Sequence, residues 1–477
     1  MNILFIYSTT KTITRSKPLQ GQEDIYLGVS YISSILKQSG HQTQLAILDR
    51  RYGINNYKTI DSKFESFNPD MVCFTSVFSE FEFICSISRY IKTNYPKTLA
   101  VIGGVHVSIN PKEGYLDIFD IICIGEGEYP LIELANNIEN NKPYTDIQNF
   151  WVKSNGKIIK NNPRPFIENI SLLPFPDREI WKEWILKSNS RFTVLLGRGC
   201  PFNCTYCCNH KIRKISSGKY VRLRDVEDII SELKQIAKDF PSVDEFFLEV
   251  ETCGIDTNWL VSLCNALFLF NCQFKVPKRF STNLRVFPNI KEEIIFQALQ
   301  KANFYAVSIG LESGNERVRR EVLNREYSNN DIRRVVATAR KYGIKIGLYN
   351  LVGLPGESHA EFLDTLALNQ ELQPDWHATS IFFPYEGTVL YDKAKELGVL
   401  PKHLDFNFER QRAVLDLPRF SKKQIQREFD SFHYNVYRKT KEKSIIKLLF
   451  YFIQKFLGHN FMAQVKIGLL RLSVLIK

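Results

Sequence analysis

Three cysteines stand close together in one short stretch of the chain. Cys200, Cys204 and Cys207 occur in the run 199–207 (GCPFNCTYC), a C-x3-C-x2-C spacing that puts three thiols on one loop. Three thiolates can hold three irons of a [4Fe–4S] cluster and leave the fourth iron without a protein ligand. Such an open iron is a binding position for a substrate or a cofactor.

A zinc site is the alternative interpretation of the same loop. Zinc usually takes four ligands, so His210 or Cys208 would have to supply the fourth. No second pair of ligands follows at zinc-finger spacing, and the sequence therefore favours the cluster. Cys208 then has no assigned role, and we expect it to be a packed or spare thiol.

An alternation of strands and helices surrounds the cysteine loop and must position it. A short apolar strand is predicted just before the loop, over 192–196. Further strands are predicted over 246–249, 280–283, 306–309, 345–351 and 379–383, with helices over 226–238, 259–270, 292–301, 332–342 and 360–372. Six strands separated by helices favour a full or partial barrel, whose active site lies at the C-terminal ends of the strands.

An earlier alternation occupies the first part of the chain. Strands are predicted over 3–7, 45–48, 71–75, 99–102 and 121–124, with helices over 27–38 and 83–93. Short buried strands between helices predict a parallel sheet with helices on both faces. Small residues follow three of these strands, and such sheets bind ligands at that edge. A lone Gly-Gly pair is a common turn, but three small-residue strand ends in one sheet favour a ligand site.

The charge of the chain is unevenly distributed. The 63 Lys and Arg and 51 Asp and Glu give a net charge of +12, yet the segment 437–477 carries nine bases and one acid, and therefore +8 of that excess. The rest of the chain is left with only +4, so a globally basic nucleic-acid binder is disfavoured and no nucleic-acid partner is expected.

The same basic tail mixes charge with apolar residues. Lys443, Lys447, Lys455, Lys466 and Arg471 alternate at helical spacing with Ile, Leu and Phe. This pattern fits a helix lying in a membrane interface. A helix packed on the barrel with a solvated basic face explains it equally well. A membrane-facing tail would suit a lipid or isoprenoid substrate.

Sequence features bearing on location point to the cytoplasm. The first residues run directly into an apolar strand without a basic segment or a cleavage site, so we expect no signal peptide. The apolar run 448–453 is far shorter than the roughly 20 residues that cross a bilayer. Ten cysteines, four of them clustered, do not form a disulfide framework. We expect a cytoplasmic protein, with membrane association through the tail as one interpretation.

The cysteine motif and its preceding strand resemble the radical S-adenosylmethionine (SAM) superfamily over roughly 191–397. The earlier alternation resembles a cobalamin-binding domain, and together they resemble the B12-binding radical SAM enzymes. The resemblance implies an α/β fold of four parts. These are a Rossmann-like doubly wound parallel sheet of cobalamin-binding type (1–138), a connector rich in Pro and turn residues (139–190), a partial (β/α)6 TIM-like radical SAM barrel (191–400) and a helical C-terminal region with the basic tail (401–477).

In this resemblance Cys200, Cys204 and Cys207 are the cluster ligands, and SAM chelates the open iron. The SAM-binding residues that it implies come from the cysteine loop and the strand ends, and are Tyr206, Glu249, Glu251, Asn283, Arg285, Ser308, Glu312 and Gly353. Because Val250 separates the two acids, Glu249 and Glu251 share one face of their strand, and which of them reaches the SAM amino group stays open. Glu312 has orientation of the loops as an alternative role. Residues 353–357 (GLPGE) and 384–388 (PYEGT) match two further turns of the family.

The resemblance also implies a set of cobalamin-binding residues: Leu27, Gly28, Thr75, Ser76, Gly103, Gly104, His106, Gly125, Glu126 and Gly127. Where cobalt is ligated by histidine, a D-x-H-x-x-G motif follows the first strand, but 49–53 reads DRRYG. Cobalt is therefore expected to lack a histidine lower ligand, which favours release of its methyl group. His106 is the one substitute, and a structural or substrate-facing role is favoured for it.

The function implied is a cobalamin-dependent radical SAM enzyme that methylates an unactivated carbon, through a 5′-deoxyadenosyl radical and methylcobalamin. Its cofactors would be a [4Fe–4S] cluster, SAM and cobalamin. Its partners would be a small-molecule or lipid substrate and an external electron donor such as flavodoxin or ferredoxin. The alternatives are a radical SAM cyclase or rearrangement enzyme without methyl transfer and a non-catalytic cobalamin-binding protein.

Overall fold

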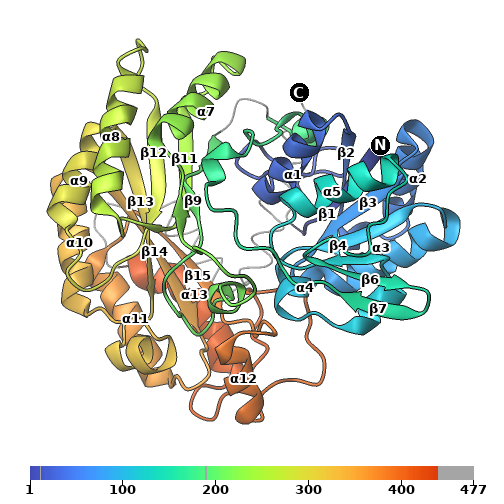
Figure 1. The fold of residues 1–477 in the computed structure, drawn as a ribbon. Coiled ribbons are helices and arrows are strands. Elements are labelled where there is room, and N and C mark those ends of the chain that lie inside the picture. Colours follow the sequence, from blue (N-terminus) through green and yellow to red (C-terminus); the bar gives the residue numbers. More distant parts are fainter. Residues whose placement is uncertain (11, 188–190, 439–477) are drawn as a thin grey trace. The chain divides into compact units, whose positions relative to one another are not determined.

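The computed structural model describes residues 1–10, 12–187 and 191–438, and the chain in it folds into two compact units (Figure 1). The first unit comprises 1–201 and 208–225, and the second begins with 202–207 and resumes at Val226. The cysteine run is therefore divided, with Cys200 in the first unit and Cys204 and Cys207 in the second.

The first unit is built on a seven-stranded sheet in the order β2-β1-β3-β4-β5-β6-β7. Its first five strands are parallel, as predicted, and the last two are antiparallel. The strands are β1 (Asn2–Ser8), β2 (Gln42–Leu48), β3 (Met71–Thr75), β4 (Leu99–Gly103), β5 (Ile121–Cys123), β6 (Phe150–Ser154) and β7 (Lys157–Lys160).

Helices cover both faces of this sheet, because successive side chains of a strand point to opposite faces. Ile3 and Phe5 of β1 pack into one core with α1 and α5, whereas Leu4 and Ile6 pack into a second core with α2 and α3 (Figure 1). The helices are α1 (Leu27–Gln38), α2 (Asn55–Phe67), α3 (Phe81–Asn94), α4 (Val105–Ile109) and α5 (Glu128–Glu139). The doubly wound architecture predicted from the sequence is thus confirmed.

The segment 139–190, predicted as a connector, contributes directly to the first unit. It supplies β6 and β7, and its Trp181 and Trp184 are buried in the core beside α1. Strands β6 and β7 were not predicted because the abundant prolines conceal the apolar spacing. Phe150 and Val152 are buried and alternate with less buried neighbours, which is the pattern of a strand with one face in the core. Helix α2 was likewise not predicted, because only Ile60, Phe64 and Phe67 mark its buried face.

The second unit contains five parallel strands in the order β15-β14-β13-β12-β11. They are β11 (Glu245–Cys253), β12 (Arg279–Leu284), β13 (Phe304–Glu312), β14 (Lys345–Val352) and β15 (Trp376–Ile381). The expected strand before the cysteines is present as β8 (Phe192–Leu195), which belongs to the first unit. All six strands of the predicted partial barrel are therefore found.

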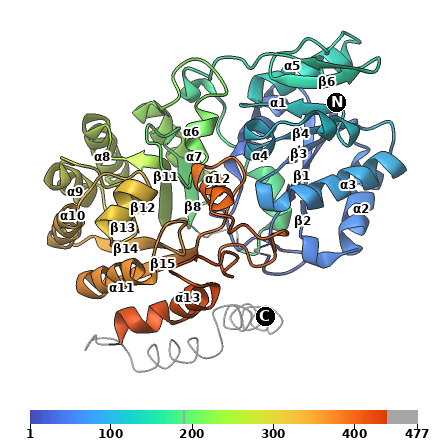
Figure 2. The ribbon, with the colours of Figure 1, turned by 90° about the horizontal axis from the view of Figure 1, so that it is seen from below.

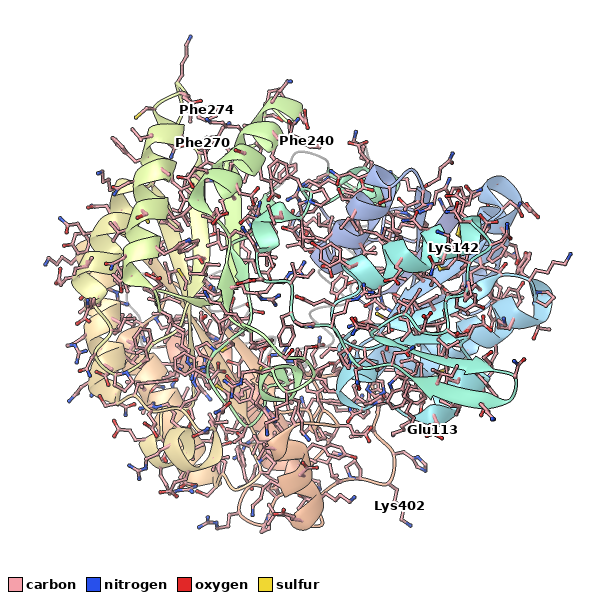
Figure 3. All side chains as sticks on the ribbon, in the orientation of Figure 1. Glu113, Lys142, Phe240, Phe270, Phe274 and Lys402 are labelled. Atoms are coloured by element: carbon pink, nitrogen blue, oxygen red, sulfur yellow. The ribbon has the colours of Figure 1, made fainter. Side chains whose placement is uncertain are left out.

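Helices α8 to α11 lie side by side along the outside of the second unit's strands (Figure 2). The helices of this unit are α7 (Val226–Asp239), α8 (Thr257–Asn271), α9 (Glu292–Lys301), α10 (Asn329–Lys341), α11 (His359–Leu372), α12 (Val389–Glu396) and α13 (Lys422–Tyr437). Near the end of α8, the Phe270 ring packs edge-on against that of Phe274, with 5.0 Å between ring centres (Figure 3).

Local sequence determines where three of these helices begin. Ser328, Ser358 and Ser421 each cap the backbone three residues ahead, and the side chain at that third position returns a hydrogen bond to the serine's N–H. This reciprocal capping box satisfies amides that the first helical turn leaves without partners.

Helix α13 packs on the second unit: the Tyr437 hydroxyl donates to the Pro374 carbonyl at 3.0 Å. Within the described ranges, no helix has both the length and the apolar content needed to cross a membrane. The predicted basic tail helix, from Lys443 to Arg471, lies outside the described residues.

Candidate functional site

The part of the cysteine loop that belongs to the second unit is held by backbone hydrogen bonds. Thr205 N–H donates to the Leu323 carbonyl at 3.2 Å, and the Thr205 hydroxyl donates to Val322 O at 2.6 Å. Leu390 N–H donates in turn to the Thr205 carbonyl at 3.0 Å. Cys204 and Cys207 are joined by a turn in which Cys207 N–H donates to Cys204 O at 3.1 Å. These hydrogen bonds therefore fix the loop between Cys204 and Cys207.

The approach to Cys200 depends on a glycine. Gly199 has φ +88°, and a Cβ there would lie 2.2 Å from the Tyr220 carbonyl oxygen, so no other residue fits. Cys200 and Cys204 are both buried. No disulfide joins any of the ten cysteines, all of which fall in the described part of the chain.

Across the described residues, no group of three or more His, Cys, Asp or Glu side chains lies close enough together to hold a single metal ion. In a [4Fe–4S] cluster each thiolate binds a different iron, so the three sulfurs need not converge. The donor set of three thiols on a fixed loop fits that group.

Arg285 contacts the cysteine loop directly. Its Nη1 donates to the Cys204 sulfur at 2.9 Å, and its guanidinium carbon lies 3.7 Å from the centre of the Phe202 ring. Asn283, two residues earlier at the end of β12, accepts a hydrogen bond from the Tyr349 hydroxyl at 3.4 Å. Tyr349 had no sequence signal, because its position in β14 reads as an ordinary strand residue.

Glu312 and Tyr206 meet at a buried arginine that the sequence motifs do not reveal. Glu312 Oε1 accepts from the Tyr206 hydroxyl at 3.1 Å and from Arg325 Nη1 at 3.0 Å, while Arg325 Nη1 also donates to Tyr206 at 2.6 Å. Burial raises the pKa of Tyr206 well above its ordinary value. Burial alone would lower the pKa of Arg325, but Tyr206, Tyr327 and Glu312 raise it well above its ordinary value. This geometry supports the alternative role of Glu312, orienting the cysteine loop.

Glu249 and Glu251 alternate with buried residues along β11 and are both exposed. Desolvation by surrounding protein, and then repulsion from Glu251, raise the pKa of Glu249. Two carboxylates on one open face suit a cationic ligand group, such as an ammonium. On the neighbouring strands, Ser308 pairs in register with Asn283 and is largely buried.

Gly353 lies against α13. A Cβ at this position, where φ is +79°, would be 2.9 Å from the Ile425 side chain. Its amide and that of Leu354 donate to Glu357 Oε2 at 2.9 and 3.1 Å, and burial raises the pKa of Glu357 to about 8. The Glu357 carboxyl therefore closes the 353–357 turn by accepting hydrogen bonds from two of its amides. A contact of Gly353 with SAM stays a prediction.

In the first unit, the ends of β3 and β4 bring four predicted cobalamin-binding residues together. Gly104 has φ +98°, and a Cβ on it would lie 2.8 Å from Ser76 N and O and 2.9 Å from Thr75 Oγ1. Ser76 N–H donates to the Gly103 carbonyl at 3.1 Å. The buried Ser76 hydroxyl has no hydrogen-bond partner among the described residues. A close backbone approach with an unsatisfied hydroxyl fits a large bound ligand.

Leu27 and Gly28 open α1 beside this strand edge. A Cβ on Gly28 would lie 3.2 Å from the ring of Tyr26, which stacks on Tyr7 with 5.5 Å between ring centres. Leu27 is buried, so the N-terminus of α1 presents Tyr26, which is 37% exposed, and the backbone at Gly28.

His106 is buried among aromatic rings. It is 3% exposed, its Nε2 lies 3.3 Å from the Tyr115 hydroxyl, and its ring centre is 4.5 Å from that of Phe81. This aromatic packing favours the structural role. Asp49, at the position of the missing D-x-H-x-x-G motif, is likewise engaged: Arg51 and Thr12 donate to it, and despite its burial they lower its pKa.

Glu126 is committed to protein partners. Its carboxylate accepts from Ile167 N–H at 2.8 Å, from Arg222 Nη1 at 3.0 Å and from Arg198 Nη1 at 3.1 Å. Gly125 and Gly127 flank it, and a cavity of about 320 Å³ beside this turn is lined by Glu126, Asn149, Arg164 and Phe166 among others. Sequence reasoning missed Arg198 and Arg222, because isolated arginines on the two-residue strands β9 (Gly197–Arg198) and β10 (Arg222–Leu223) form no motif.

Two protein families match this chain in succession. Residues 22–135 match the B12 binding domain, and residues 194–368 match the radical SAM superfamily. The first match covers the sheet edge with Ser76 and Gly104, and the second covers the cysteine loop and strands β11 to β14.

Relatives and one solved structure resemble the chain over most of its length. It is 24% identical to an uncharacterized methyltransferase of Pyrococcus horikoshii, over 94% of this chain and 95% of that protein. It is 21% identical to the anaerobic magnesium-protoporphyrin IX monomethyl ester cyclase of Cereibacter sphaeroides, over 80% of this chain and 62% of the cyclase. The structure of the radical SAM methyltransferase TsrM of Kitasatospora setae, with cobalamin and a [4Fe–4S] cluster bound, superposes with a TM-score of 0.64 at 16% identity, covering 90% of this chain and 85% of TsrM. Because one chain matches both the B12 binding domain and the radical SAM superfamily, it belongs to the B12-binding radical SAM enzymes.

Proposed function

We propose that this enzyme is a cobalamin-dependent methyltransferase that methylates an unactivated carbon of a small molecule. One observation carries the proposal: the same chain presents a fixed three-cysteine loop and, at the ends of β3 and β4, a glycine-lined edge with an unsatisfied Ser76 hydroxyl. The similarity to an uncharacterized methyltransferase over nearly the whole chain supports the assignment.

The residues that would hold each group follow from their chemistry. Cys200, Cys204 and Cys207 would bind the cluster, and Glu249 or Glu251 would accept hydrogen bonds from the SAM amino group. Ser76 and Gly104 would lie against cobalamin. When bound, these groups supply the electron that cleaves SAM and the methyl group that is transferred. No side chain of this chain is assigned as a general acid or base.

The protein's own contribution is positioning and exclusion of water. Backbone hydrogen bonds hold Thr205 between Cys204 and Cys207, and Arg325 neutralises Glu312 beside the loop. His106 packs in an aromatic cluster, and Arg51 binds the Asp49 carboxylate. We therefore propose that cobalamin binds without a histidine ligand.

Anaerobic reconstitution tests the proposal. Wild-type protein should show the absorbance of a [4Fe–4S] cluster, form 5′-deoxyadenosine under reducing conditions, and add one methylene unit to the mass of its product. Cys204→Ala should lose the cluster and 5′-deoxyadenosine formation together. Cys272→Ala, the same change at an exposed cysteine, is the control and should retain both. Full turnover by a variant lacking all three loop cysteines would contradict the assignment.

A radical cyclase without methyl transfer is the second candidate, favoured by the similarity to the anaerobic cyclase. Product mass separates the two, because cyclisation leaves the mass unchanged or depleted in hydrogen. Comparative metabolite and lipid mass spectrometry of cells with and without the protein would identify the substrate class as well.

We propose further that a one-electron donor such as flavodoxin or ferredoxin reduces the enzyme in the cytoplasm. Replacing dithionite with reduced flavodoxin should sustain 5′-deoxyadenosine formation, and failure with several such donors would contradict this partner class. Membrane contact rests on residues 439–477, outside the described part of the chain, and stays a sequence-based prediction.

A further inference from the structure

Arg285 makes two contacts with the same short piece of the cysteine loop. Its Nη1 donates to Cys204 Sγ at 2.9 Å, and its guanidinium stacks over the ring of Phe202, 3.7 Å from the ring centre. Because Phe202 stands two residues before Cys204, one loop supplies both the acceptor and the surface that orients the donor. A guanidinium held over an aromatic ring loses little further freedom when it forms the hydrogen bond.

One donor of the same guanidinium has no acceptor in the described part of the chain. Arg285 Nε is buried and has no hydrogen-bond partner among the described residues. A buried donor without an acceptor is costly, and such atoms mark positions where a ligand completes the network. Arg285 Nε belongs to the same guanidinium whose Nη1 donates to Cys204 Sγ. An acceptor for Nε would therefore belong to a group bound close to the Cys204 sulfur.

We propose that Arg285 sets the reduction potential of the cluster through its charge-assisted hydrogen bond to the Cys204 thiolate. This proposal rests on the cluster assignment made above. Reduction of the cluster adds one electron and no proton, so the reduced form carries one more negative charge. A fixed positive charge and an N–H···S bond stabilise that form and raise the potential, as hydrogen bonds to cluster sulfurs generally do. Arg285 is thus a positioning and tuning residue.

The test is a redox titration of the reconstituted holoenzyme without SAM, followed by the electron paramagnetic resonance of the reduced cluster. Arg285→Gln should lower the equilibrium constant for reduction at least tenfold, which for one electron is about 59 mV. Arg279→Gln is the matched control: it removes the same charge from the other end of β12, where Arg279 is half exposed and pairs with Glu245. Its potential should equal that of the wild type.

Two further variants cover the case in which Arg285→Gln fails to assemble a cluster. Arg285→Lys keeps the charge but not the planar donor, and Phe202→Leu keeps Arg285 but removes its stacking surface. Both should lower the potential by less than Arg285→Gln. A wild-type potential in Arg285→Gln, or in both of these variants, would overturn the proposal. A wild-type protein that binds no cluster would instead contradict the proposed function itself.

Discussion

Arg198, two residues before Cys200, donates from Nη2 to Glu128 Oε1 at 2.7 Å and from Nη1 to Glu126 Oε1 at 3.1 Å. Burial alone would lower the pKa of Arg198, but the two carboxylates raise it further above its ordinary range. Arg198 therefore links the turn at residues 125–128 (GEGE) to the segment of chain that leads into the cysteine loop.

This ion-pair network should be important for the stability of the first unit. Glu128→Gln leaves Arg198 with one buried carboxylate instead of two, and we expect the free energy of unfolding to fall by about 1–3 kcal/mol. Chemical denaturation measures it. Glu179→Gln, in the exposed pair with Lys182, should change it by less than about 0.5 kcal/mol. If both variants lost the same free energy of unfolding, the buried network around Arg198 would stabilise the protein no more than an exposed ion pair does.

Gly104→Ala should abolish cobalamin uptake without affecting the cluster. The new Cβ would lie 2.8 Å from the Ser76 backbone and displace the end of β3 or β4. Gly40→Ala is the control, since Gly40 has a similar φ of +90° but open space around it, so it imposes the conformational strain of roughly 1–2 kcal/mol without the clash. Cobalamin absorbance and iron content after gel filtration measure the two outcomes. Full cobalamin binding by Gly104→Ala would remove this edge from the site.

The Arg325–Glu312 pair should behave as a coupled buried unit. Arg325→Gln leaves the Glu312 carboxylate buried without its cation and should cost about 3–5 kcal/mol. Glu312→Gln should cost less, because Tyr206 and Arg325 can still donate to the amide oxygen. Denaturation of the two single variants and the double variant gives the coupling energy, which we expect to exceed about 0.5 kcal/mol. Simple additivity would contradict the network.

Glu357 should make stability depend on pH. Its pKa rises from 4.5 in the unfolded chain to about 8 in the folded protein because of burial, so the folded state holds a proton that the unfolded state releases. Its stabilising contribution is full below pH 4.5 and is lost as pH rises through about 8. The maximum slope is about 1.4 kcal/mol per pH unit. Glu357→Gln should have a flatter profile than wild type between pH 5 and 8.5, and parallel profiles would refute this.

Short-range sequence patterns predicted much of the fold, because they reflect local physics. Helices α1 and α9 begin and end at the predicted residues, since apolar periodicity and the flanking residues mark both. The cysteine spacing predicted its loop in the same way. The strand-end glycines were identified for a similar reason, since a positive φ such as that of Gly104 is a property of one residue.

Tertiary structure alone revealed which side chains are occupied by protein partners. Tyr206 and Glu312 are 106 residues apart and are joined by a direct hydrogen bond and by Arg325, while Glu126 meets Arg198 across 72 residues. Both acids looked available to cofactors in the sequence, and both are bound by arginines in the fold. Arg285 is likewise found beside the cysteine loop only in the fold, since it contacts Cys204 across 81 residues of sequence. Such pairs carry no local signal, because they are created only when strands distant in sequence become neighbours in a sheet.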